Sequence, residues 1–344
     1  MKLEDFDYEL PPELIAQHPA PRREDARLLV VERGSGLLHD ARVADLPEWL
    51  RRGDVLVVNE TRVRPARLSL RRVPGGARME MLFVRPASTP EEWRVLARPA
   101  RRAAIGTRLE SLESGLAVEV VALGEQGERI VRVIEGNLSD ALARAGEIPL
   151  PPYIGHTPTD EDRERYQTVY ARVDGAVAAP TAGLHLSWPL LERLEGAGVG
   201  IARLLLHVGP GTFRPITAPD PREHRMDEEF FDVPEDVTRA VNAARAAAGR
   251  IVAVGTTVVR ALEAAADAHG GSLAPTSGWT RKFIHPPYEF RAVDALLTNF
   301  HLPRTSLLLL VAAFAGEALQ RRAYAHAIAA RYRFYSYGDA MLVI

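Results

Sequence analysis

The chain has 344 residues, of which 47% are apolar and 26% are charged, and its formal net charge is −2; these values are ordinary for a globular protein, and the length is sufficient for two domains. The absence of cysteine excludes disulfides, thiolate metal ligands and cysteine nucleophiles. No apolar stretch follows the first residues as in a signal peptide, and the longest apolar run, 307–315, is shorter than the ~20 residues of a membrane span, so we expect a cytoplasmic protein without a membrane segment.

The first part of the chain, residues 1–64, predicts α/β structure. Short helices are expected at 11–15 and 47–50, and strands at 28–31 and 55–58.

The pattern changes after residue 64, where short apolar segments alternate with turn signals up to about residue 149. This spacing indicates a small β-barrel or sandwich. Its expected strands are 80–84, 93–97, 116–121 and 130–133.

Helices and strands alternate again in the last part of the chain. Helices are predicted at 186–197, 235–248, 257–269, 307–317 and 318–333, and strands at 201–206, 251–254 and 295–297. We therefore predict an α/β protein with a mixed, largely parallel sheet. Its catalytic domain is discontinuous, comprising residues 1–64 and 150–344, and is interrupted by an inserted small antiparallel β-barrel of residues 65–149.

The segment 62–108 is unusually basic. It holds twelve arginines and only three acidic residues, Glu80, Glu91 and Glu92, which is typical of a surface that faces phosphates. The alternative is compositional bias, because the whole chain has only two lysines, Lys2 and Lys282. Bias explains the choice of arginine over lysine, but it does not explain why acidic residues are rare here.

Four aliphatic runs, 55–58, 201–206, 251–254 and 295–297, each end in a polar cluster. Continuous aliphatic runs are typical of buried parallel strands, and ligands of open α/β sheets bind beyond the carboxyl ends of the strands. We therefore predict that the four clusters form one pocket. They contain Asn59, Thr61 and Arg62; His207, Gly209, Gly211 and Thr212; Thr256 and Thr257; and Asn299 and His301.

Two of the expected helix entries have features of binding loops. Thr256 and Thr257 begin a helix with Arg260 one turn further on, which favours an anion such as a carboxylate; plain helix capping by threonine is the equal alternative. The loop 180–185 combines small residues with a histidine, which is typical of a cradle for a flat ligand or of an ordinary helix entry.

The segment His224–Glu229 combines a histidine with acidic residues. A metal site would need a second ligand pair at a spacing such as H-E-x-x-H, which is absent, so a carboxylate for proton transfer or a solvated acidic face is expected instead. The chain also lacks a G-x-S-x-G elbow, a Walker A loop and the kinase motifs. These patterns indicate a pocket for an anionic or nucleoside-like small molecule but specify no reaction.

Eight segments spread over nearly the whole chain carry a resemblance to a known family. They are 6–11, 14–17, 53–63, 165–171, 175–185, 207–213, 298–303 and 331–341. Together they closely resemble the S-adenosylmethionine:tRNA ribosyltransferase-isomerases of queuosine biosynthesis, and the likeness is weakest between residues 65 and 149.

The resemblance implies a reaction. The ribosyl moiety of S-adenosylmethionine is transferred to the 7-aminomethyl group of 7-deazaguanine at the tRNA wobble position and is isomerised, giving epoxyqueuosine-tRNA with release of adenine and methionine. It also implies an α/β domain interrupted by a β-barrel. The expected partners are tRNA bearing 7-aminomethyl-7-deazaguanine and S-adenosylmethionine, the ribosyl-donor co-substrate. No prosthetic group, no metal and a monomeric protein are expected.

The resemblance also directs attention to residues in the matched motifs. The titrating groups available for catalysis are His185, His207, Asp227, Glu229 and His301, and their individual roles stay open. The candidate substrate ligands are Asn59, Thr61, Arg62, Gln167, Pro180, Thr181, Gly183, Gly209, Gly211, Thr212, Thr256, Thr257, Arg260 and Asn299, of which Thr256, Thr257 and Arg260 are assigned to the methionine carboxylate. The candidate RNA ligands are Arg98, Arg101 and Arg102.

One departure from the family pattern concerns Asp227, because the family usually has histidine at this place, and weight therefore shifts to Glu229. Two other functions are compatible with the same residues. One is a non-catalytic RNA-binding protein that has kept the fold, and the other is an enzyme acting on a free nucleoside or nucleotide.

Overall fold

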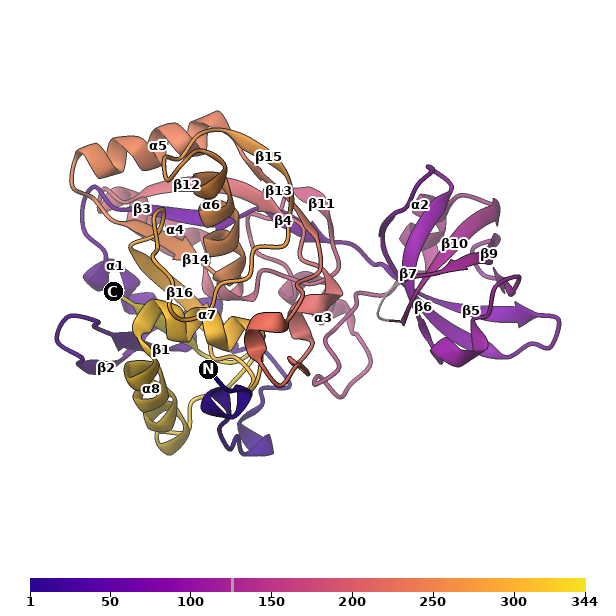
Figure 1. Ribbon diagram of the computed structural model, residues 1–344, viewed down its shortest axis with the longest axis horizontal. Coiled ribbons are helices and arrows are strands. Elements are labelled where there is room, and N and C mark those ends of the chain that lie inside the picture. The colour runs from indigo at the N-terminus through magenta and orange to yellow at the C-terminus, as the bar shows by residue number, and fades with distance from the viewer. Residues whose placement is uncertain (125–126) are drawn as a thin grey trace.

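The structure is a computed structural model that describes residues 1–124 and 127–344. Figure 1 shows a large α/β part and, set apart on one side, a smaller part made of strands. The large part is built on a nine-stranded sheet in the order β15-β13-β12-β3-β14-β16-β17-β1-β2. The strands are β1 (Arg27–Val31), β2 (Leu38–Arg42), β3 (Val55–Asn59), β12 (Gly200–Leu206), β13 (Glu229–Val233), β14 (Ile251–Val254), β15 (Thr276–Thr280), β16 (Ala295–Asn299) and β17 (Ala340–Val343).

The centre of the nine-stranded sheet is parallel. Strands β12, β3, β14 and β16 run in one direction, so their carboxyl ends reach the same edge. All residues of β3, β14 and β16 are buried, which is why their sequences are continuous aliphatic runs. The mixed α/β class is confirmed. However, four of the eight strand pairings among the described residues are antiparallel, so the sheet is more mixed than predicted.

Helices cover both faces of this sheet (Figure 1). The helices are α1 (Leu46–Trp49), α3 (Asp160–Arg165), α4 (Trp188–Gly196), α5 (Glu235–Ala246), α6 (Thr256–Ala268), α7 (Ser306–Ala315) and α8 (Glu317–Ala329). Val55 and Val57 pack in one hydrophobic core with residues of α5 to α8, whereas Leu56 and Val58 pack in a second core with α1 and α4. Among the described residues, no helix combines the length and the apolar character needed to cross a membrane.

The residue immediately before α6 is Gly255, so the N-cap position of this helix is a glycine and not a threonine. Gly255 has a φ of 96°, which favours glycine, and no side chain caps this helix. The predicted threonine cap is therefore wrong, and the Thr256 and Thr257 side chains are free for another role.

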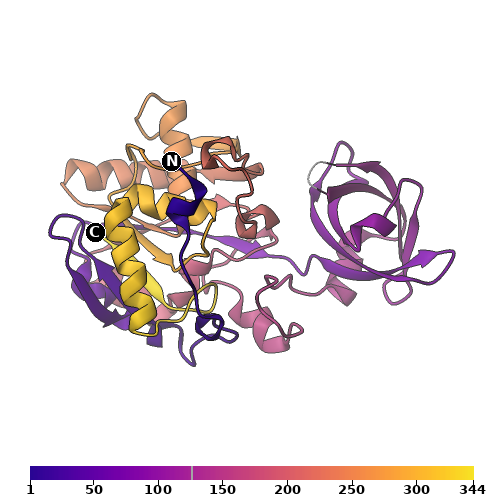
Figure 2. The same ribbon diagram turned by 60° about the horizontal axis from the view of Figure 1, so that its bottom comes forward.

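The smaller part contains six antiparallel strands and helix α2 (Leu138–Ala145). The strands are β5 (Arg67–Val73), β6 (Arg78–Pro86), β7 (Glu92–Arg98), β8 (Arg108–Ser111), β9 (Leu116–Leu123) and β10 (Glu128–Glu135). Because β10 pairs with both β7 and β9, the pairing closes on itself, as the ring of strands in Figure 2 shows. Leu68, Phe83 and Val118 form its separate hydrophobic core with Ala141 of α2.

A two-stranded sheet lies where the chain leaves the large part. It pairs β4 (Thr61–Val63) with β11 (Val173–Ala176) in parallel.

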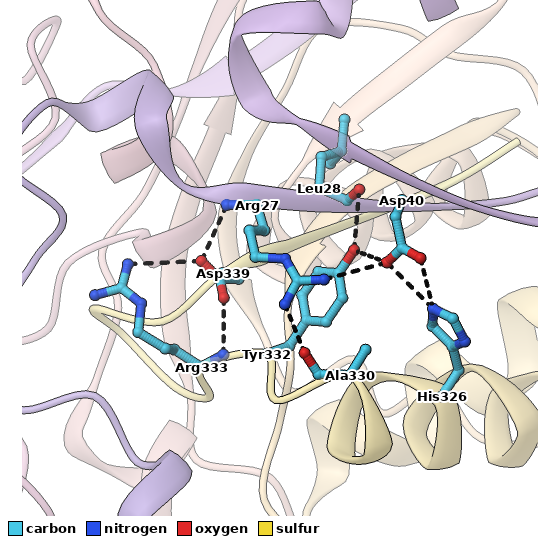
Figure 3. Close-up of polar contacts among 8 residues, drawn as sticks. All are labelled: Arg27, Leu28, Asp40, His326, Ala330, Tyr332, Arg333 and Asp339. Carbon is cyan, nitrogen blue, oxygen red and sulfur yellow. Dashed lines mark hydrogen bonds and ion pairs between the residues drawn. The ribbon is translucent and has the colours of Figure 1, made fainter.

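Both ends of the turn 333–338 are held against β1 and β2, at one end of the nine-stranded sheet, by the contacts drawn in Figure 3. The carboxylate of Asp339 accepts from the backbone N–H of Arg27 at 3.0 Å and from that of Arg333 at 2.7 Å. The Tyr332 hydroxyl donates to Asp40 at 2.5 Å, and the guanidinium of Arg27 lies 3.7 Å from the centre of the Tyr332 ring. These contacts tie the turn to β1 and β2.

Candidate active site

A pocket lies at the edge where the parallel strands end. Three of the four predicted polar clusters contribute to it, namely those after β12, β14 and β16, together with the loop 179–182 and the turn after α8. Its empty space, counted out to open solvent, is about 590 Å³. The predicted substrate and catalytic residues that line it are Pro180, Thr181, Thr212, Thr256, Thr257, Asn299 and His301.

The cluster after β3 is used for backbone contacts instead. The Asn59 amide donates to the carbonyl oxygen of Leu206 at 2.8 Å and accepts from the N–H groups of Leu206 at 3.0 Å and Thr61 at 3.1 Å. Arg62 is exposed and donates to the carbonyl oxygen of Ala171 at 2.8 Å. These side chains join β3 to its neighbours and do not line the pocket.

Gln167 and Gly183 also support the scaffold. The Gln167 amide accepts a hydrogen bond from the backbone N–H of Val63 at 3.0 Å and donates one to the Val63 carbonyl oxygen at 2.7 Å. It therefore pairs with the backbone of β4 as the backbone of a neighbouring strand would. A Cβ atom on Gly183 would lie 2.2 Å from the Tyr170 hydroxyl, so a larger residue cannot pack there.

Two buried histidines, His185 and His301, lie beside β16 and are neutral at pH 7. His301 lines the pocket and its Nε2 lies 2.8 Å from the Thr298 hydroxyl, while the Nε2 of His185 lies 3.1 Å from the amide nitrogen of Asn299. Burial lowers the pKa of His301 to about 3, and burial together with the charge of Arg333 lowers that of His185 to about 3. Each ring therefore acts as a hydrogen-bonding imidazole rather than as a cation.

His207 lies outside the pocket, although it follows the same strand edge. Its Nδ1 lies 2.8 Å from the Thr61 hydroxyl, and burial, with the nearby charge of Arg64, lowers its pKa. A Cβ atom on Gly175 would lie 2.3 to 2.5 Å from the imidazole ring, so this ring packs directly on the glycine backbone. The ring also stacks on Phe230 with centroids 6.0 Å apart.

Glu229 and Arg260 form a buried ion pair behind the pocket, with side chains only 3% and 2% exposed. Oε1 of Glu229 also accepts from the N–H of Gly209 at 2.8 Å and from the hydroxyl of Thr212 at 3.3 Å. The guanidinium predicted to hold a carboxylate of the substrate is thus already paired inside the protein. Through these contacts Glu229 fixes the loop 209–212.

A second, wider cleft lies between the six-stranded sheet and the large part, with about 1310 Å³ of empty space. Arg85 of β6 crosses it to Glu228 at 3.4 Å, and Arg281 reaches the same carboxylate at 3.2 Å. Gly209 and Pro210 line this cleft, whereas Val208 and Thr212 of the same loop line the first pocket.

Asp227 belongs to the second cleft and not to the pocket. Its carboxylate lies 3.4 Å from the guanidinium of Arg214. A Cβ atom on Gly211 would lie 2.1 Å from this carboxylate, which explains the glycine at that position.

Sequence reasoning missed two aromatic residues of the pocket, Tyr153 and Tyr335. Their rings stack with centroids 4.3 Å apart, and the Tyr153 hydroxyl lies 2.5 Å from that of Ser336. Tyr335 has a φ of 73°, which is rare for an aromatic residue and marks strain of the kind found at functional sites. For Tyr335, the available signal was the long matched segment 331–341, from which no residue was selected. Tyr153 lies in none of the matched segments.

Three buried polar atoms at the pocket have no hydrogen-bond partner within the described chain. They are the hydroxyl of Thr257, the amide oxygen of Asn299 and the hydroxyl of Tyr335. Leaving such an atom unpaired costs about 1–3 kcal/mol, so their gathering in one pocket indicates a polar ligand.

The arginines of segment 62–108 divide into two groups. Several are neutralised, for example by the pairs Arg67–Glu80, Arg94–Glu128 and Arg108–Glu110. Six are exposed and have no ion pair to any residue that the structure describes, namely Arg71, Arg72, Arg78, Arg98, Arg101 and Arg102. In residues 1–124 and 127–344, no three His, Asp or Glu side chains gather as metal ligands would.

Comparisons with known proteins agree with one another. The sequence model of a family described as "Queuosine biosynthesis protein" matches residues 3–343. The S-adenosylmethionine:tRNA ribosyltransferase-isomerase of Thermus thermophilus is 54% identical over 99% of both chains, and that of Symbiobacterium thermophilum is 50% identical over the full length of both. A crystal structure of S-adenosylmethionine tRNA ribosyltransferase from Thermotoga maritima is 36% identical, covers 99% of this chain and 100% of its own, and has a TM-score of 0.56.

Proposed function

The chain belongs to the queuosine biosynthesis protein family as a transferase of the S-adenosylmethionine:tRNA ribosyltransferase-isomerase type, and from this premise we propose its detailed reaction. It transfers and isomerises the ribosyl moiety of S-adenosylmethionine onto the 7-aminomethyl group of 7-deazaguanine at the tRNA wobble position. The products are epoxyqueuosine-tRNA, adenine and methionine. No prosthetic group or metal takes part, and the protein acts as a cytoplasmic monomer.

The observation that carries this proposal is the strand-edge pocket with its three unpartnered polar atoms. A nucleoside offers both the flat apolar surface and the several hydrogen-bonding groups that such a pocket requires. We propose that S-adenosylmethionine binds here, with its carboxylate at the N-terminus of α6 beside Thr256 and Thr257, where the helix dipole favours an anion. Arg260 supports this helix end through its pair with Glu229 rather than by touching the carboxylate.

The chemistry requires three proton transfers. The sulfonium acidifies the ribose C5′ protons, so a base removes one of them; the attacking amine of the tRNA must lose a proton, and the departing adenine must gain one. Of the five titrating candidates in the described chain, His301 is the one that lines the pocket. We propose that its neutral imidazole, which contacts the Thr298 hydroxyl through Nε2, forms a hydrogen bond with the substrate through its other ring nitrogen.

The tRNA is proposed to approach through the second cleft. Residues 65–149 form the RNA-facing module in this proposal, and residues 1–64 and 150–344 form the catalytic domain. Arg98, Arg101 and Arg102 are free to contact the RNA backbone, because none of them is engaged with an acidic residue of the described chain. The loop 208–212 lines both spaces, so the 7-aminomethyl group of the tRNA is proposed to reach past this loop to the ribosyl group of S-adenosylmethionine.

The test is adenine release. Purified protein is incubated with S-adenosylmethionine and tRNA that carries 7-aminomethyl-7-deazaguanine, and adenine is measured by chromatography. Matched tRNA with guanine at the wobble position is the control and should yield none. Folded protein that binds the modified tRNA but releases no adenine above background would reject the transferase reaction in favour of a non-catalytic RNA-binding protein. Equal release without tRNA would favour an enzyme of free nucleosides.

A further inference from the structure

The side-chain amide of Asn299 is locked in one orientation at the pocket. Asn299 ends β16 and is 2% exposed. Its amide nitrogen donates to the Nε2 of His185 at 3.1 Å and to the carbonyl oxygen of Tyr335 at 3.0 Å, which uses both N–H groups. The opposite orientation would place the amide oxygen against the Tyr335 carbonyl, which can only accept.

His185 is one of the two groups that fix the orientation of the Asn299 amide. Its Nε2 can accept the hydrogen bond from Asn299 only when that nitrogen carries no proton. The ring is buried, and the positive charges of Arg333 and Arg23 lie near enough to disfavour its protonation. Because the Asn299 N–H faces Nε2, we assign the single proton of the neutral ring to Nδ1, and Nε2 is then an acceptor throughout the neutral pH range.

In this orientation the amide oxygen of Asn299 faces the pocket and acts only as a hydrogen-bond acceptor. The amide oxygen of Asn299 has no partner in the described chain, is buried, and can accept a hydrogen bond but not donate one. The unpartnered hydroxyls of Thr257 and Tyr335 can do either, so they do not discriminate in the same way. A ligand group that faces Asn299 must carry an N–H or O–H.

We propose that Asn299 is a specificity-determining residue that reads a hydrogen-bond donor of the co-substrate, and that His185 is the positioning residue that keeps its amide oxygen turned towards the pocket. This proposal rests on the proposed function. S-adenosylmethionine offers three donors of this chemistry: the exocyclic amine of adenine, the ribose hydroxyls and the methionine ammonium.

The test uses unreactive analogues as competitive inhibitors. Inhibition constants are measured for S-adenosylhomocysteine and for its inosine, 2′-deoxy, 3′-deoxy and desamino analogues, during adenine release with saturating modified tRNA. In the wild type, the analogue that lacks the donor facing Asn299 should bind about 10- to 100-fold more weakly than the parent. The identity of that analogue distinguishes the three sources of the donor.

Variants of His185 and Asn299 then test whether His185 orients the Asn299 amide or only stabilises the fold. With His185→Leu, the amide loses one of its two acceptors and only the Tyr335 carbonyl still opposes the turned orientation, so the ratio of the inhibition constant of the donor-lacking analogue to that of the parent should fall. With His185→Gln, an amide oxygen can replace Nε2 as the acceptor, so the ratio should be retained. If His185→Leu fails to fold, Asn299→Ser makes the same prediction, because a hydroxyl can both donate and accept. Asn242→Asp is the matched control, since the Asn242 amide donates to the Leu273 carbonyl and does not line the pocket, so this variant should keep the wild-type ratio.

Two results would overturn the proposal. One is a wild type that binds all the analogues equally, and the other is full discrimination that survives in both His185→Leu and Asn299→Ser. A wild type that releases no adenine at all would instead reject the proposed function.

Discussion

Replacing Glu229 by glutamine is expected to cost stability rather than to remove a catalytic base. Arg260, the ion-pair partner of Glu229, is 2% exposed, and its Nε and Nη1 already lack partners in the described chain. Removing the negative charge leaves this guanidinium buried and uncompensated, which costs about 3–5 kcal/mol of unfolding free energy. Glutamine still accepts from the N–H of Gly209, so the loss should lie at the lower end of this range.

The assay is urea unfolding followed by tryptophan fluorescence, together with adenine release at a temperature where all variants are folded. The double variant Glu229→Gln with Arg260→Met should recover about 2 kcal/mol, because the orphaned charge is gone. Glu317→Gln is the matched control: its pair with Arg321 is exposed, so the cost should stay below about 0.5 kcal/mol. If Glu229→Gln unfolds like the wild type but slows adenine release by about 100-fold or more, Glu229 takes part in the chemistry and the structural interpretation is wrong.

Three further predictions follow from the same structure. The double variant Arg101→Ala with Arg102→Ala should weaken tRNA binding and reduce the slope of log affinity against log salt concentration by about 0.7–0.9 for each phosphate that is no longer neutralised. The control variant Arg321→Ala should change neither the affinity nor the slope. An unchanged slope in the double variant would show that the two arginines do not contact the RNA backbone. The pKa values of His185 and His301 lie at about 3 in the folded protein, below the value of about 6.5 expected when unfolded, so below pH 6.5 the unfolded chain binds more protons and stability falls as the pH is lowered towards 3. At pH 5 urea unfolding should therefore show a loss on the order of 2 kcal/mol for each histidine, reduced in His185→Gln, and equal stability at pH 5 and pH 7 would contradict the buried neutral rings. Gly175→Ala should displace the ring of His207 from Thr61 and lower the midpoint of thermal unfolding. Gly196→Ala, which meets no atom within 4 Å at the end of α4, should not lower the midpoint, and a Gly175→Ala midpoint equal to that of the wild type would refute the close packing.

The buried parallel strands were the most predictable part of the fold. Aliphatic runs such as 251–254 have one explanation, burial on both faces, and they were found at the expected positions. Strands β5 and β8 were missed because their sequences carry no such signal, since both contain charged residues. Strand β17 was missed although it is a continuous apolar run, because it is only four residues long and overlaps the motif 331–341. Strands β2, β4, β11, β13 and β15 were not predicted either. The family resemblance, carried by long ordered motifs, is confirmed by the comparisons.

The candidate site was predictable in outline but not in detail. A polar residue after a buried strand predicts where its Cα lies, not which partner its side chain takes. Asn59 and Asn299 both end parallel strands, yet the amide of Asn59 is consumed by the backbone of β12, while the oxygen of Asn299 stays free at the pocket. Arg260 was correctly placed near the start of α6, but its partner Glu229 comes from β13, a strand that the sequence did not indicate. Such choices depend on contacts between segments far apart in the chain.

The position of β17 has a consequence for the order in which the molecule forms. This strand, from residues 340–343, lies between β16 and β1, so the hairpin of β1 and β2 from the beginning of the chain has no place in the sheet until residue 343 has been made. The six strands from Arg67 to Glu135, by contrast, complete their pairing from one contiguous stretch. During synthesis on the ribosome, the six-stranded part can thus fold early, while the first hairpin waits for the last strand.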